Sequence, residues 1–335
     1  RVRDQYANRF KIHFPGEERE AGRPLRKRPA FQFQKELGGV FGLNYGWEHP
    51  LYFDFDTPDT EGFTRQDWWK SVRREALLLR KNVGIIDISN FGKYLCCGDG
   101  AYEFLDGIFA NKIPKNVGGS CLSPIIGKMG GIAADATITK LSEDSFWIVS
   151  SGAAEGFQQR FYNLVKRGKG TEFISKSEDY CGFNVAGPKS RELLRRLSNK
   201  DLSNEAWPFF KSGNLTIAGV ECLALRVSFT GDLGWELYCE KDNQLELYKL
   251  LIENASQIGG GPVGSRALMS LRLEKGYGSW GREYSPEYWP HEVGLERLIA
   301  NKPNFINKNE VESVLALPAR EQLVAVSYTH LRAHE

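Results

Sequence analysis

The sequence predicts an α+β fold with mixed or antiparallel sheets and packed helices, preceded by an extended arm. Short strand-like stretches alternate with helical ones, and hairpin-like turns join several strands, which favours mixed or antiparallel sheets over a doubly wound one. Neither a GxGxxG after a strand nor a GxxxxGKS or GxxxxGKT is present, so no flavin, nicotinamide or nucleotide phosphate cradle is evident. The 335 residues, 41% of them hydrophobic, suffice for two or three domains with a sizeable core.

The composition argues against several classes of function. The formal net charge is +2, and no long basic run is interleaved with aromatic residues, so nucleic acid is not an expected partner. No apolar run reaches the roughly 18 to 20 residues that span a membrane. The six cysteines are scattered without a CxxC pair, and the five histidines show no metal-ligand spacing. We therefore expect no metal site, no structural disulfide and no membrane segment.

The chain divides into three parts. Residues 1–60 are rich in proline, glycine, aromatic and charged residues and predict an extended arm or a small subdomain that wraps another surface. Residues 61–310 carry the regular strand and helix patterns of the main domain. Residues 311–335 end in VSYTHLRAHE, which continues no apolar period and resembles a cloning or sequencing adaptor. Because the chain also begins at Arg1, we interpret it as a fragment of a longer polypeptide.

The first half of the main domain has a regular order of elements. Residues 64–82 predict a helix, because Trp69, Val72, Ala76 and Leu79 recur at helical spacing. The elements that follow are two short strands around a turn within 83–98, a helix over 100–110, strands over 135–140 and 145–151, and an amphipathic helix over 154–168.

The second half continues the alternation. Residues 178–198 predict a strand, a tight Gly187-Pro188 turn and a helix, since proline suits the first helical position. The remaining elements are strands joined by turns over 215–240 and helices over 243–256 and 264–276.

The stretch GGIAADATI, residues 130–138, contains a single acid, Asp135. A glycine pair gives a bend without side-chain bulk, and on the strand after it Asp135 and Thr137 share one face. One interpretation is a turn or capping aspartate. The other is a carboxylate held in a pocket for a cationic or proton-releasing reaction.

A second acidic stretch is SFTGDLGWELY, residues 228–238. Asp232 is typical of a turn between strands, and on the strand beyond it Glu236 and Tyr238 share a face. Glu236 fits either a solvated strand face or a fixed carboxylate that accepts paired N–H donors from a flat heterocycle.

A third stretch is SRALMSLRLEKGYGSWGRE, residues 265–283. Arg266 and Arg272 lie on one predicted helix, where each can bind a ligand carboxylate, form an internal ion pair or extend to solvent along an apolar surface. Tyr277 and Trp280 then place aromatic rings on a glycine-rich loop.

Together these stretches resemble the folate-binding aminomethyltransferase family, the glycine-cleavage T-protein and its relatives. Order and spacing agree from about Val83 to Asn307, including the early strand GIIDISNFG. The arm EREAGRPLRKRPAFQFQKELGGVFGLNYGWEHPLYF resembles the connector that precedes this part in FAD-dependent dimethylglycine and sarcosine dehydrogenases. The resemblance implies an aminomethyltransferase folate-binding fold over 61–310 and a flavin domain upstream of the arm.

The resemblance also implies functional residues. Asp135 matches the catalytic aspartate, and the folate-binding positions fall on Thr137, Glu236, Arg272 and Trp280. The implied cofactor is tetrahydrofolate, which accepts the one-carbon unit to form methylene-tetrahydrofolate, with FAD held only by the missing upstream domain. The implied partners are a small-molecule substrate, folate and that domain, in the mitochondrial matrix of a eukaryote or the cytoplasm of a bacterium.

Two positions depart from the family pattern. Asp232 stands where glutamate is usual, and Leu122 stands where relatives usually carry a tyrosine. Two other functions remain open from the sequence. The first is a free aminomethyltransferase of glycine cleavage, and the second is a non-catalytic regulatory subunit resembling that of pyruvate dehydrogenase phosphatase.

Overall fold

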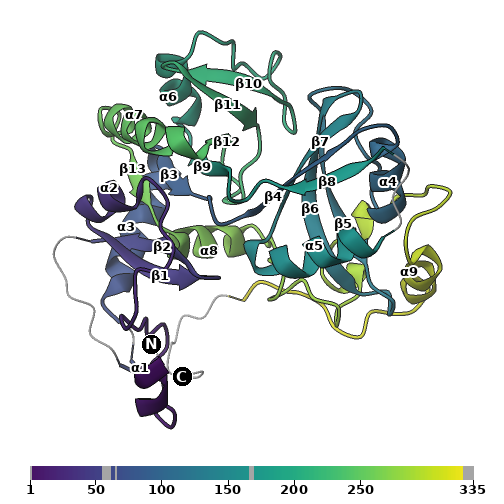
Figure 1. The fold of residues 1–335 in the computed structure, drawn as a ribbon, viewed down its shortest axis with the longest axis horizontal. Coiled ribbons are helices and arrows are strands. Elements are labelled where there is room, and N and C mark those ends of the chain that lie inside the picture. The colour runs from purple at the N-terminus through teal and green to yellow at the C-terminus, as the bar shows by residue number, and fades with distance from the viewer. Residues whose placement is uncertain (1, 55–61, 65, 166–169, 327–335) are drawn as a thin grey trace.

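The structure, a computed structural model, describes residues 2–54, 62–64, 66–165 and 170–326. Within these residues the strands form three sheets (Figure 1). The largest has six strands, in the spatial order β10 (Ser212–Ile217), β11 (Val220–Leu225), β12 (Gly234–Glu240), β9 (Tyr180–Ala186), β3 (Gly84–Asp87) and β13 (Gly261–Val263). Its strands are antiparallel except for β13, which runs parallel to β3, so the sheet is mixed.

The second sheet is antiparallel throughout. Its five strands follow the order β5 (Ser120–Ile126), β6 (Ile132–Ser142), β7 (Ser145–Ser150), β4 (Gly92–Cys97) and β8 (Glu172–Ser175). The third sheet is the hairpin β1 (Gly39–Asn44) and β2 (Trp47–Phe53). Its two-residue turn, Tyr45 and Gly46, has positive φ at both positions, as the tightest hairpin turn requires.

The helices cover the sheets from outside and fill the space between them. They are α1 (Val2–Ala7), α2 (Phe31–Glu36), α3 (Trp68–Lys81), α4 (Ala101–Ile108), α5 (Glu155–Leu164), α6 (Ser190–Leu197), α7 (Gln244–Ser256), α8 (Ser265–Glu274) and α9 (Lys308–Leu315). Among the described residues, 3-10 turns lie at Gly152–Ala154, Lys241–Asn243, Pro290–Glu292 and Glu296–Leu298.

Three apolar clusters fix this arrangement. Helices α6 and α7 pack on one face of the six-stranded sheet, and α4 and α5 pack on the outer face of the five-stranded sheet. The third cluster joins α3 and α8 to the remaining face of each sheet, with Trp147 and Val149 from β7 and Tyr238 from β12. Strand β12 is covered on both sides for this reason, and its residues Gly234 to Cys239 are all buried. The inner faces of the two sheets therefore meet.

The later part of the arm is packed against the main domain, whereas α1 buries none of its residues. Ala30 lies in the cluster under α7, and Tyr52 lies in the cluster between the sheets. At the crossover from β3 to β4, the carbonyl oxygen of Ser89 accepts hydrogen bonds from Arg28 Nη2 (3.2 Å) in the arm and Lys93 Nζ (3.0 Å) on β4. The arm thus contacts the point where the chain passes from one sheet to the other.

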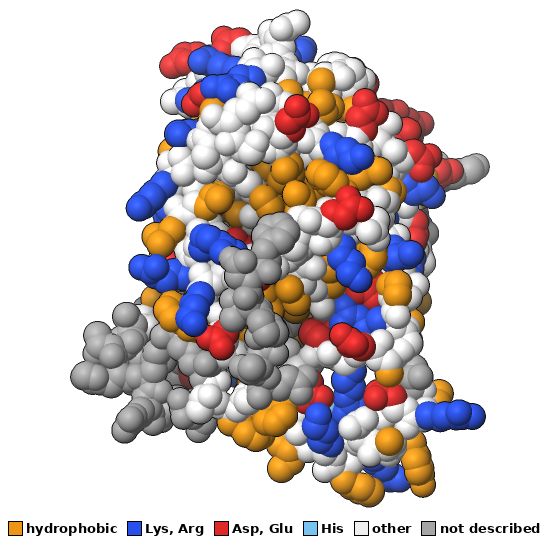
Figure 2. Space-filling view, turned by 90° about the vertical axis from the view of Figure 1, so that its left-hand side faces the viewer, with side chains coloured by type: hydrophobic (Ala, Val, Ile, Leu, Met, Phe, Trp, Pro, Cys, Tyr) orange, Lys and Arg blue, Asp and Glu red, His pale blue; other side chains and the backbone are white. Residues whose placement is uncertain are grey.

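Charges of both signs are mixed on one face of the molecule. On the face that Figure 2 shows, lysine and arginine side chains are interspersed with aspartate and glutamate. Apolar side chains gather at its lower end, over the N-terminal segment, where the exposed ones are Val2, Tyr6, Phe10 and Ile12. No described helix is both long and apolar enough to cross a membrane.

The predicted fold class is confirmed, while several element bounds differ. The strand predicted over 135–140 begins earlier, at Ile132, and extends to Ser142, so Asp135 is not its first residue. The helix predicted over 64–82 begins at Trp68. Strand β5 has no counterpart among the predicted elements; its Pro124 is tolerated because β5 is an edge strand.

Some predicted limits fall on residues that the structure does not describe. These are the boundary between residues 60 and 61, the helix end at Gly168 and the adaptor-like tail from residue 327 onward.

Glu75 is a buried acid that joins the arm to α8. Its Oε1 accepts the backbone N–H of Phe53 (2.6 Å), and its Oε2 accepts that of Gly264 (2.8 Å) at the start of α8. Burial raises the pKa of Glu75 to about 7, although both N–H groups oppose the rise. Each oxygen therefore satisfies one buried donor.

We predict that Glu75→Gln lowers the free energy of unfolding by about 1–3 kcal/mol, because the new NH2 group leaves one buried N–H without an acceptor. Urea unfolding at pH 7 measures the loss, with Glu246→Gln on the exposed face of α7 as the matched control. Equal stability of the two variants would contradict the assignment.

Candidate functional site

The inner face of the five-stranded sheet carries Asp135. Antiparallel register places Thr137 beside Val149 and Thr139 beside Trp147, and alternation puts Asp135 on the same face. The opposite face of β6 holds Ala134, Ala136 and Ile138 against α4 and α5, as expected from the sequence. Asp135 and Thr137 are partly exposed to solvent, unlike most of their neighbours.

Asp135 has no cationic partner in the part of the chain that the structure describes. Burial raises the pKa of its carboxyl to about 6, and its own backbone N–H opposes the rise. A carboxyl with a pKa near neutrality can exchange a proton at physiological pH. Because Asp135 lies within a strand, the turn and capping interpretation is wrong.

The glycine pair before Asp135 permits a close approach of backbone. A Cβ at Gly131 would lie 2.0 Å from the carbonyl oxygen of Pro286, and the N–H of Ile132 donates to Tyr288 O (3.2 Å). The loop after α8 therefore crosses the start of β6. Trp280 on this loop donates its indole N–H to Ala133 O (2.7 Å) and stacks on Phe157 of α5, with ring centroids 6.3 Å apart.

Glu236 lies on the facing sheet, near the middle of β12. Its neighbours in register are Leu225 on β11 and Asn184 on β9, and its side chain is buried. The hydroxyl of Tyr238 donates to Glu236 Oε2 (2.6 Å). Burial raises the pKa of Glu236 to about 7, although this hydrogen bond lowers it. Burial rules out the solvated-face interpretation.

An aromatic contact connects the two faces. The rings of Trp147 on β7 and Tyr238 on β12 have centroids 5.8 Å apart, and Tyr180 packs on Trp147 at 5.1 Å. Asp135 and Glu236 therefore lie on sheet faces that turn toward each other at this contact. Both are carboxyl groups without a described cationic partner, and raised pKa values of this kind concentrate at functional sites.

Arg272 forms the internal ion pair that the sequence left open. It is fully buried, and its two terminal nitrogens donate to both oxygens of Glu283 (2.7 and 3.1 Å) and to Tyr277 O (2.7 Å). Burial alone would raise the pKa of Glu283, but hydrogen bonds from Arg272 and the Ser279 N–H hold it below its usual value. Arg272 thus orders the loop that carries Trp280.

Two positions that depart from the expected pattern have different surroundings. Leu122 on β5 is the cross-strand neighbour of Thr137, so it belongs to the same face as Asp135. Asp232 lies in the turn before β12, where its Oδ1 accepts from Arg80 (3.3 Å), as the turn interpretation allows.

Known proteins resemble this chain in sequence and in fold. A family model described as the GCVT N-terminal domain matches residues 30–302. The chain belongs to the GCVT family. The mitochondrial dimethylglycine dehydrogenase of Mus musculus is 31% identical over 334 residues, which are 98% of this chain and 38% of that enzyme. An aminomethyltransferase of Thermoanaerobacter sp. (strain X514) is 30% identical over 290 residues, 85% of this chain and 73% of that protein.

A solved structure supports the fold of this GCVT-family chain. Glycine cleavage system aminomethyltransferase T from Bartonella henselae matches with a TM-score of 0.74 at 22% identity, over 87% of this chain and 75% of that one. The chain spans about two fifths of the length of the dimethylglycine dehydrogenases that it matches. The aminomethyltransferase fold predicted from the sequence is confirmed.

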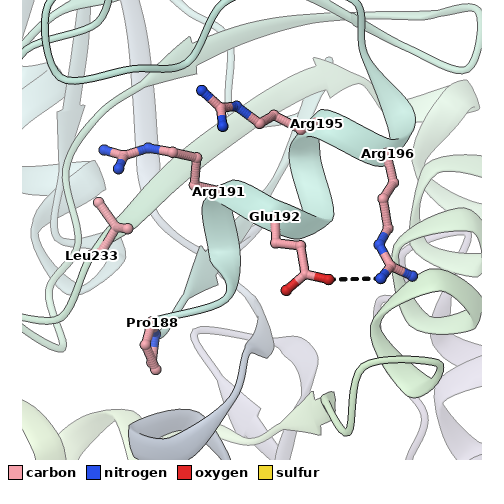
Figure 3. Close-up of a pocket in the computed structure, with 6 residues that line it drawn as sticks. All are labelled: Pro188, Arg191, Glu192, Arg195, Arg196 and Leu233. Atoms are coloured by element: carbon pink, nitrogen blue, oxygen red, sulfur yellow. Dashed lines mark hydrogen bonds and ion pairs between the residues drawn. The ribbon is translucent and has the colours of Figure 1, made fainter.

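The GCVT-family chain also has a hollow of about 430 Å³ over α6, lined by Pro188, Arg191, Glu192, Arg195, Arg196 and Leu233 (Figure 3). Its arginines already have acceptors, since Arg196 pairs with Glu192 (2.6 Å) and Arg191 donates to Asn204 Oδ1 (2.5 Å). None of the sequence-predicted residues lines it. The described residues also hold no cluster of histidine, cysteine, aspartate and glutamate that could bind a metal ion.

Sequence reasoning missed the partners of the predicted residues. Tyr238 shares a strand face with Glu236 at i+2 spacing, so its position was readable, whereas its hydrogen bond was not. Glu283 lies in the same stretch as Arg272, but the sequence does not show that the two pair. Trp147 comes from a distant segment, and only the packed fold brings it to β12.

We predict that Arg272→Lys loosens the loop of this GCVT-family chain, because a lysine cannot make the two-pronged contact with Glu283. Stability should fall by about 1–3 kcal/mol, and amide exchange at Ser279 and Trp280 should quicken. Arg282→Lys, exposed on the same loop, is the control. Identical exchange rates in the two variants would show that the ion pair does not hold the loop.

Proposed function

We propose that this chain binds tetrahydrofolate between the two facing sheets, as the folate-binding part of an FAD-dependent dimethylglycine or sarcosine dehydrogenase-like enzyme. The observation that carries this proposal is Glu236, a buried carboxylate whose described contacts include one hydroxyl and no cation. Leaving such a group unpaired is costly, so its retention fits a ligand that supplies the missing donors.

The chemistry of Glu236 suits a pterin. Tyr238 occupies Oε2, and no described hydrogen bond reaches Oε1. A flat ring with adjacent N–H groups can donate to both oxygens of a carboxylate side by side, and such charge-assisted bonds are among the stronger ones. The low-dielectric surroundings strengthen them further.

Asp135 takes a different role in the proposal. In this enzyme class a flavin supplies the oxidation of the methylamine, which we assign to the upstream domain. Transfer of the one-carbon unit to a folate nitrogen then involves a cationic methylene carbon and releases a proton. A carboxylate on the facing sheet can stabilise that cation and take the proton, effects that contribute about a hundred- to ten-thousandfold in rate. Its pKa of about 6 suits proton acceptance near neutral pH.

The other predicted residues support the ligand in different ways. Thr137, on the face of Asp135, offers a hydroxyl to folate, and Trp280 offers a ring held by Ala133 O. Arg272 is committed to Glu283, so we assign it to ordering the loop of Trp280. The implied partners are the methylamine substrate and the flavin domain, in the mitochondrial matrix of a eukaryote or the cytoplasm of a bacterium.

A free aminomethyltransferase of glycine cleavage is the second candidate. The 30% identity to the Thermoanaerobacter aminomethyltransferase over most of that protein favours it. The two candidates differ in the donor of the one-carbon unit, an oxidised methylamine or an aminomethyl group carried by a partner protein. Methylene-tetrahydrofolate formation from each donor distinguishes them.

We predict that Glu236→Gln weakens tetrahydrofolate binding about ten- to a hundredfold, since hydrogen bonds to a charged group are worth about 1.5–3 kcal/mol. Calorimetric titration measures the dissociation constant, with Glu240→Gln, exposed at the end of the same strand, as the control. Unchanged affinity in Glu236→Gln would refute the pterin contact.

We predict that Asp135→Asn keeps folate affinity within a few-fold but slows one-carbon transfer at least a hundredfold, because the amide neither stabilises a cation nor accepts the proton. In the complete polypeptide, amine oxidation should continue and release formaldehyde in place of methylene-tetrahydrofolate. Product analysis on this variant and on the exposed control Asp242→Asn tests this. Loss of binding with normal transfer at saturation would make Asp135 a contact only.

A further inference from the structure

Tyr238 is the one described polar contact of Glu236. The two residues are two apart on β12, so their side chains leave the sheet on the same face. Both are buried, and the hydroxyl lies 2.6 Å from Glu236 Oε2, a short distance typical of O–H donors to a carboxylate. With Oε2 fixed in this way, rotation of the carboxyl group is restricted and the place of Oε1 is set.

The ring of Tyr238 is itself held from the opposite sheet. Trp147 on β7 contacts it at 5.8 Å between centroids, and Tyr180 packs against Trp147 at 5.1 Å with a steep interplanar angle of 65°. Since Trp147 shares the inner face of the five-stranded sheet with Asp135, the orientation of Glu236 depends on how the two sheets meet.

We propose that Tyr238 is a positioning residue that holds Glu236 ionised and aims its free oxygen at the folate, so that the pH dependence of folate affinity is set by this pair. The proposal rests on the proposed folate contact of Glu236. It adds that the carboxylate works through a neutral hydroxyl instead of a counter-cation, which leaves its negative charge available to the ligand.

Tyr238 is the neighbouring group that changes the pKa of Glu236. Titratable groups on the surrounding segments include Asp135 on the facing β6, Asp232 before β12, and Tyr180 on β9, which contacts Trp147. None of these contributes to the pKa of Glu236, which burial raises and the Tyr238 hydrogen bond lowers. Strand β11 adds Leu225, and β9 adds the neutral Asn184.

The direction in which pH changes folate affinity follows from the opposite effects of burial and of the Tyr238 hydrogen bond on the pKa of Glu236. Folate binding requires the ionised carboxylate, so affinity falls as pH drops through the pKa of Glu236. Removing the hydroxyl removes the contribution that lowers this pKa, so affinity should begin to fall at a higher pH. A hydrogen bond to a charged group changes the ionisation equilibrium about ten- to a hundredfold, which corresponds to a shift of roughly one to two pH units.

The experiment is titration of the chain with tetrahydrofolate under anaerobic conditions from pH 6 to 9. Tyr238→Phe is compared with Tyr248→Phe, a fully buried tyrosine that stacks on Phe183 on the other side of the six-stranded sheet. All measurements use an Asp135→Asn background, which removes the titration of Asp135. We expect the pH of half-maximal affinity to rise by one unit or more in Tyr238→Phe alone, with a smaller loss at pH 9 than at pH 7.

Two results would overturn the proposal: an unshifted pH profile, or an equal loss of affinity at every pH, which a merely structural role would produce. Glu236→Gln in the same series separates this proposal from the proposed function. If that variant binds folate normally, the pterin contact is wrong. If it binds weakly while Tyr238→Phe keeps the parent pH profile, only the role of Tyr238 is wrong.

Discussion

Ser89, at the crossover from the six-stranded to the five-stranded sheet, is the residue on which the relation of the two sheets depends. All its polar atoms are hydrogen-bonded. Its N–H donates to Asp87 (2.8 Å), its carbonyl oxygen accepts from Arg28 and Lys93, and its hydroxyl exchanges hydrogen bonds with the backbone of Gly182. Side chains from the arm, β3 and β4 thus converge on one short connection. Buried polar networks whose members are all hydrogen-bonded make a structure rigid, because breaking one hydrogen bond leaves a buried donor or acceptor without a partner.

The candidate site is the consequence of that junction. Once the crossover fixes the two sheets, the ring of Trp147 meets that of Tyr238, and the strands that carry Asp135 and Glu236 face each other. Burial removes water from both acids without supplying a cation, which raises their pKa values to about 6 and about 7. Other buried acids have donors on both oxygens. Glu75 accepts one backbone N–H on each oxygen, and four hydrogen-bond donors from Arg320 and Trp289 hold Glu292 at a pKa of about 2. This contrast supports the proposal that Asp135 and Glu236, which have no described cationic partner, contact a ligand.

Much of the site could be predicted from the sequence, because side chains alternate between the two faces of a strand. Alternation alone placed Asp135 with Thr137, and Glu236 with Tyr238, on single faces. The predicted strand start, Asp135, lies three residues after the observed one, Ile132. The glycine pair does lie in a bend just before the strand, and Gly131 also admits the backbone of Pro286, which the sequence did not indicate. The ion pair of Arg272 was one of several alternatives, since nothing local distinguishes Glu283 from a ligand carboxylate. Contacts between distant segments, such as Trp147 with Tyr238, depend on packing that no local pattern encodes.

The central claim is that folate lies between the two sheets with its pterin on Glu236. A crystal structure of the chain with bound tetrahydrofolate tests it most directly. The claim predicts pterin N–H groups within hydrogen-bond distance of Glu236 Oε1, Tyr238 still donating to Oε2, and Asp135 on the side of the reactive folate nitrogens. A folate bound over α6 or elsewhere on the surface, with Glu236 uncontacted, would contradict it.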